Sequence, residues 1–159
     1  MAGCDLVLFE EDLERANTAL DAFLRETEAK CVLVIDKGGH LIAVRGVTES
    51  MDTASLSALA AGAFASTREI ARLIGEPEFS VLFHQGRREH IHVSIIDDDT
   101  LLMALFDERT TIGIIRLYAK ETERDIARLF GEIRRDRTRG ARVLGDLNRG
   151  KADTPFPPT

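Results

Sequence analysis

The stretch from Asp52 to Gly75 has the most regular helical pattern in the chain, and it constrains the fold more than any other segment. Met51, Asp52 and Leu56 occupy the positions of a hydrophobic staple around an aspartate cap, so we expect the helix to begin here. Gly75, followed by Pro77, predicts where it ends. Apolar residues recur along it at steps of three and four and predict a core-facing stripe: Leu56, Leu59, Ala60, Ala63, Phe64, Ile70, Ala71 and Ile74.

The opposite side of this helix should face water, yet it carries almost no long polar side chains. Ala58, Gly62, Ala65 and Glu69 fall there at about 100° per residue. We interpret this side as a docking surface, because a smooth helix face lets another backbone approach closely. The alternative is a helix that is rich in alanine for its helical propensity alone. The predicted partner-binding residues are Ala58, Ala61, Gly62, Ala65, Ser66 and Glu69.

The remaining segments predict one α+β domain of two packed layers. An amphipathic pattern predicts a helix from about Phe9 to Glu28, and helical spacing returns from about 111 to 136. Between them, apolar runs and turn residues predict a tight hairpin and then a three-stranded antiparallel meander. The expected strands are 30–36, 40–45, 78–85, 90–96 and 100–106.

Composition excludes several classes of protein. The 159 residues are 44% apolar and 30% charged, which is typical of one soluble domain. The net charge of −6 gives no reason to expect a nucleic acid or an anionic membrane as partner. The N-terminus has no basic segment before its short apolar run, so we expect no signal peptide. Cys4 and Cys31 lack metal or redox spacing, and we expect them to be reduced thiols in the cytoplasm.

Three histidines are the strongest candidates for chemistry. His84, His90 and His92 lie on two neighbouring strands, where a zinc-dependent hydrolase could place its ligands. A solvated strand face is the interpretation that we favour, because no Cys, Asp or Glu at ligand spacing completes the set. On the strand at 90–96 we expect His90, His92 and Ser94 to point outward, and Ile91, Val93 and Ile95 inward.

Other motifs predict no active site. The run Asp97–Asp99 lacks the spacing of a calcium loop and is interpreted as a hairpin turn. The chain has neither a phosphate-binding glycine loop nor a serine or cysteine in a nucleophile motif. We therefore predict no catalytic residue, no bound metal and no cofactor.

The charge distribution changes near the C-terminus. From Arg134 to Lys151 there are seven basic and two acidic residues, so this segment is +5 while the rest of the chain is −11. It is interpreted either as a solvated helix end or as an electrostatic arm for an acidic partner. We expect residues 1–137 to form the domain and 138–159 to form a basic and then proline-rich disordered tail.

Five stretches, in this order and spacing, resemble bacterial Roadblock-domain proteins of the MglB type. They extend from about Leu6 to Phe130 and read LVLFEEDL, VLVIDKGGHLIA, DTASLSALAAGAFAST, LIGEPEFSVLFHQG and LFDERTTIGIIRL. The resemblance implies a five-stranded antiparallel sheet with the central helix on one face and the two terminal helices on the other. It also implies that 112–119 is helical, whereas propensity alone leaves strand open.

The same resemblance implies a symmetric homodimer and a partner. The strand at 78–85 would pair across the two-fold axis, and the two central helices would lie side by side. The dimer-interface residues that follow are Phe79, Ser80, Val81, Leu82 and Phe83. The implied partner is a small Ras-like GTPase of the MglA type, in cell polarity or gliding motility. The dimer would promote GTP hydrolysis without supplying an arginine finger. The alternative is a Roadblock adaptor that binds a GTPase or another partner without activating it. Glu69 bears on this choice, because members of the family often have a small or uncharged residue at its position.

Overall fold

The structure is a computed structural model, and it describes residues 6–152. Three helices and five strands follow in the predicted order, so the expected fold class is confirmed. The helices and strands are α1 (Glu10–Thr27), β1 (Cys31–Asp36), β2 (Leu41–Gly46), α2 (Thr53–Ile74), β3 (Val81–Gln85), β4 (His90–Ile95), β5 (Thr100–Phe106) and α3 (Ile112–Ala152).

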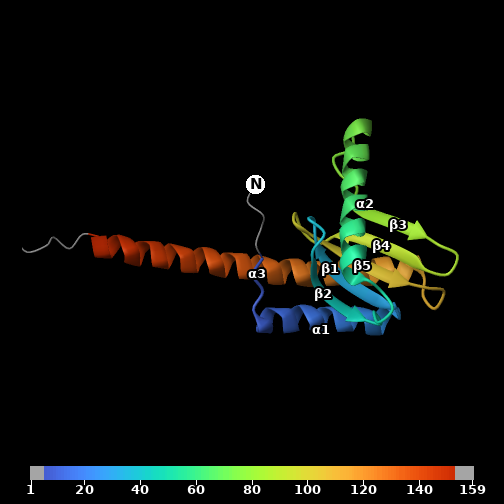
Figure 1. Ribbon diagram of the computed structural model, residues 1–159, viewed down its shortest axis with the longest axis horizontal. Coiled ribbons are helices and arrows are strands. Elements are labelled where there is room, and N and C mark those ends of the chain that lie inside the picture. Colours follow the sequence, from blue (N-terminus) through green and yellow to red (C-terminus); the bar gives the residue numbers. More distant parts are fainter. Residues whose placement is uncertain (1–5, 153–159) are drawn as a thin grey trace, which may run out of the picture.

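The strands form one antiparallel sheet in the order β2-β1-β5-β4-β3, which leaves β2 and β3 at its edges. Helix α2 lies on one face of the sheet, and α1 and α3 lie together on the other (Figure 1). Each face buries its own core. Phe64 of α2 packs with Leu33, Val93 and Met103, while the α1–α3 side buries a larger cluster that includes Phe130.

Burial on both faces corrects one prediction about β4. His92 and Ser94 were expected to point into solvent, but they are 1% and 2% exposed. The side chains on this face of the sheet point toward α3, which covers them. A strand between two helical layers has no solvent-facing side, so alternation of polar and apolar residues does not identify one.

The two ends of α2 are built as predicted. The Asp52 carboxylate accepts a hydrogen bond from the Ser55 backbone N–H at 3.0 Å, and Gly75 ends the helix with φ of 80°. The hairpin between β1 and β2 approaches the helix closely at its first turns. A Cβ on Gly39 would lie 2.8 Å from Ala58 Cα, and Gly39 has φ of 92°, so this position requires glycine.

The predicted core stripe of α2 is wrong in part. The buried residues are Ser57, Ala61, Phe64 and Ala71, so the helix is rotated about its axis relative to the expectation. Leu59, Ile70 and Ile74 belong to the predicted stripe but are 73%, 51% and 63% exposed. The C-terminal half of α2 also rises beyond the sheet (Figure 1), where this chain offers little to cover it.

Helix α3 is much longer than predicted. It was expected to end near Asp136 and to give way to a disordered tail from 138, but it continues to Ala152. Ile133 is its last buried apolar side chain, and the remainder projects away from the domain (Figure 1). Arginine, alanine and leucine are good helix formers, and no proline occurs between Pro77 and Pro155. Cys4 and residues 153–159 lie outside the described residues. Within 6–152, no helix has the length and apolar character to cross a membrane.

Candidate functional site

The exposed small-residue face of α2 is the first part of the site. Ala58, Gly62 and Ala65 are exposed, and a Cβ built on Gly62 meets no atom within 4 Å. Ala61 differs from the other predicted partner-binding residues, since it is only 5% exposed and packs against the sheet. The prediction that Ala61 presents its side chain to a partner is therefore wrong. We call Ala58, Gly62, Ala65, Ser66 and Glu69 the docking face.

Polar groups appear at the C-terminal end of the docking face. The Ser66 hydroxyl donates a hydrogen bond to the Gly62 carbonyl of its own helix at 3.1 Å. The Glu69 carboxylate accepts a hydrogen bond from Arg72 Nε at 2.7 Å, and both side chains are largely exposed. The charge of Glu69 is therefore balanced by Arg72. A partner would meet this salt-bridged pair beside a smooth surface of small residues.

A second exposed face of α2 is apolar, and the sequence analysis did not anticipate it. Leu59, Ile70, Leu73 and Ile74 are between 51% and 74% exposed, and we call them the apolar stripe. Ile70 and Leu73 lie 11 and 14 residues after Leu59, which places the three on one side of α2 at the spacing of helices that pack side by side. That spacing was visible in the sequence and could have indicated a helical partner. Exposed apolar side chains gathered on one helix typically mark a contact with another protein.

Strand β3 lies at one edge of the sheet. Phe79 and Ser80 precede the strand, which begins only at Val81, so the predicted strand was too long. Val81, Leu82 and Phe83 are half-buried, and the Phe83 ring stacks on Phe106 with centroids 6.1 Å apart. Among residues 6–152, β3 pairs with β4 alone, so its outer edge offers backbone N–H and C=O groups to another strand.

The three histidines do not converge. Phe83 pairs with His92 and Gln85 with His90, so these side chains share the face that packs under α3. His84 pairs with Ile91 and therefore points to the opposite face of the sheet. Across residues 6–152, no group of three or more His, Cys, Asp or Glu side chains is placed to hold a metal ion.

Cys31 is the cysteine that lies among the described residues, and it is fully buried in the core. Burial, reinforced by the negative charge of Glu89, raises its pKa to about 11. A thiol with so high a pKa is a poor nucleophile at neutral pH. The burial fits a structural side chain.

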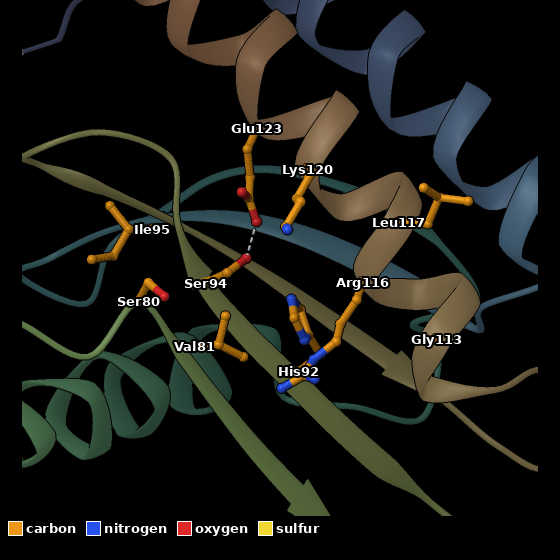
Figure 2. A pocket seen from close by; sticks show the side chains of 10 residues that line it. All are labelled: Ser80, Val81, His92, Ser94, Ile95, Gly113, Arg116, Leu117, Lys120 and Glu123. Carbon is orange, nitrogen blue, oxygen red and sulfur yellow. Dashed lines mark hydrogen bonds between the residues drawn. The ribbon is translucent and has the colours of Figure 1, made fainter.

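A cavity of about 540 Å³ lies between β3, β4 and the first turns of α3 (Figure 2). His92 and Ser94 line it from the sheet, and Arg116, Lys120 and Glu123 line it from the helix. The Ser94 hydroxyl donates to the Glu123 carboxylate, and burial raises the pKa of that carboxyl. Burial, assisted by the positive charge of Arg116, lowers the pKa of His92 to about 4. Sequence reasoning missed this cavity because it depends on how α3 covers the sheet.

Comparison with known proteins identifies the family. The model of the Roadblock/LC7 domain matches residues 15–106, which is more than half of the chain. The chain belongs to the Roadblock/LC7 family. It is also similar to three solved structures of MglB proteins, and the recognised resemblance to the MglB type is therefore confirmed.

The structural similarity to these MglB proteins covers most of the described domain. The gliding protein MglB of Thermus thermophilus is 34% identical with a TM-score of 0.76, over 80% of this chain and 97% of that one. MglB of Myxococcus xanthus is 35% identical with a TM-score of 0.75, over 80% and 96%. A structure of MglB with a tetrameric arrangement is 32% identical with a TM-score of 0.77, over 81% and 97%.

Proposed function

We propose that this Roadblock protein is a homodimeric regulator of a small Ras-like GTPase of the MglA type. It would act without an active site of its own, in the cytoplasm, within a polarity or gliding-motility system. The observation that carries the proposal is α2, which exposes a docking face and an apolar stripe on one helix. The similarity to MglB proteins supports the same function.

The apolar stripe and the β3 edge would form the dimer interface. Val81, Leu82 and Phe83 would lie where β3 pairs with its copy across a two-fold axis, flanked by Phe79 and Ser80. The apolar stripe would then be covered by α2 of the second chain. A two-fold axis would place each of these features against its own copy, so one symmetric interface would cover both. The solved MglB with a tetrameric arrangement is compatible with such self-association.

The docking face would receive the GTPase. At about 100° per residue, Ala58, Gly62, Ala65 and Glu69 lie roughly a quarter-turn around α2 from the apolar stripe, so one helix can contact a second chain and a GTPase together. Two α2 helices side by side would join their docking faces into one broad surface. Following the resemblance to the MglB type, activation would reshape the GTPase rather than donate an arginine finger, and Arg72 beside the docking face is paired with Glu69.

The test is a single-turnover GTPase assay with an MglA-type protein encoded beside this one. We expect wild type to accelerate phosphate release, and Ala65→Arg to abolish both binding and acceleration because a long cation replaces a methyl group. Thr18→Arg is the control, since Thr18 is exposed on α1, on the opposite side of the sheet. Circular dichroism should show both variants folded.

Two results separate the alternatives. Stable complex formation without acceleration would favour a Roadblock adaptor, for which the Glu69–Arg72 pair is the specific observation, because it departs from a uniformly small surface. No binding to any co-encoded GTPase, or equal activity of wild type and Ala65→Arg, would contradict the proposed docking face.

A further inference from the structure

The cavity between β4 and α3 contains a buried polar group that the fold leaves unsatisfied. His92 is 1% exposed, and neither ring nitrogen has a hydrogen-bond partner among the described residues. A buried polar atom without a partner is costly, because the hydrogen bonds that it makes to water in the unfolded chain are not replaced.

Two cations line the same cavity. Arg116 and Lys120 are one helical turn apart on α3, are exposed, and form no salt bridge with any residue in 6–152. In Figure 2 the Arg116 side chain reaches toward the His92 ring. Gly113 adds the first turn of α3 to the lining, where the helix dipole is positive. Glu123 is the acidic group in the lining; it accepts a hydrogen bond from the Ser94 hydroxyl, and the positive charge of Lys120 also acts on it.

We propose that this cavity binds a small organic oxyanion, with its carboxylate or phosphate between Arg116 and Lys120 and a polar group against His92. Guanidinium and ammonium groups supply charge-assisted donors for the oxyanion. The ring of His92 supplies one donor and one acceptor for a neighbouring hydroxyl or amide. The volume of about 540 Å³ lies within the range of about 300–1,000 Å³ usual for small-molecule sites.

The cavity lies next to β3, at the edge of the sheet. Ser80 and Val81 line it and also belong to the predicted dimer interface. The docking face lies on the other side of the sheet, so the site does not overlap the surface proposed for the GTPase. The ligand site is therefore independent of whether the chain activates a GTPase.

The test is an NMR titration of the labelled chain with inorganic phosphate and, separately, with succinate, at constant ionic strength against chloride. We expect saturable shifts at the His92 ring and the Ser94 amide with at least one of them, and the stronger of the two identifies the oxyanion. Arg116→Gln should weaken binding about tenfold or more, whereas Arg128→Gln, exposed on the same helix outside the cavity, should leave it unchanged.

His92→Phe is the second variant, because it keeps an aromatic ring but removes both nitrogens. It should lose the saturable shift at Ser94 while the spectrum elsewhere remains that of the folded chain. The proposal is overturned if neither anion gives saturable shifts in wild type, or if Arg116→Gln and Arg128→Gln bind with equal affinity. Sedimentation of the same samples would show whether the anion dissociates a dimer. NMR shifts that change in step with dissociation would also overturn the proposal, because they would report on the interface and not on a ligand in the cavity.

Discussion

Leu73 of the apolar stripe offers the most direct test of how two chains would assemble. Its side chain is 74% exposed in the single chain, and burying a leucine completely is worth about 1.5–3 kcal/mol. Covering the exposed part in a dimer should therefore contribute about 1–2 kcal/mol from each copy. Because a two-fold interface contains the residue twice, Leu73→Ser should weaken the dimer by about 2–4 kcal/mol, which raises Kd by about 30- to 1,000-fold.

The assay is sedimentation equilibrium over a dilution series, with circular dichroism to show that the helix remains folded. Val47→Ser is the matched control, because Val47 is 70% exposed in the loop before α2 and belongs to neither the stripe nor β3. We expect Val47→Ser to associate like wild type. A Kd for Leu73→Ser that equals that of wild type would refute the placement of α2 at the interface.

Three further results are expected. Phe64→Ala should lower the free energy of unfolding by about 3–5 kcal/mol in urea denaturation, because Phe64 is 1% exposed between α2 and the sheet. His92 has a folded-state pKa of about 4, below its ordinary value of 6.5, so the unfolded chain binds the proton first and stability falls as pH drops from about 7 to 4. Wild type should lose about 3 kcal/mol more than His92→Phe over that range. The raised pKa of Glu123 acts in the opposite direction in both proteins, and the comparison removes most of it. Glu69→Ala removes the exposed pair with Arg72 and should change unfolding by less than about 0.5 kcal/mol, so any change in GTPase rate reports docking.

Much of the architecture follows from local signals. The Asp52 cap and Gly75 end define α2, and the apolar runs at β1 and β5 define buried central strands, because these signals act within a few residues of each other. The helical assignment of 112–119 came from family resemblance, since Ile112, Ile114 and Ile115 favour strand as strongly as helix. The small residues of the docking face were likewise visible in the sequence, and all but Ala61 lie on the exposed side.

The tertiary structure alone decided which faces are covered. Apolar spacing predicted Leu59 and Ile70 in the core, but the angle at which α2 lies on the sheet turns Ser57 and Ala61 inward instead. Polar alternation predicted His92 in solvent, but α3 folds back over that face from more than twenty residues along the chain. Periodicity tells which residues share a side of an element, because that depends on local backbone geometry. Which side meets the core depends on contacts between segments that are distant in the sequence, and a local pattern carries no information about those contacts.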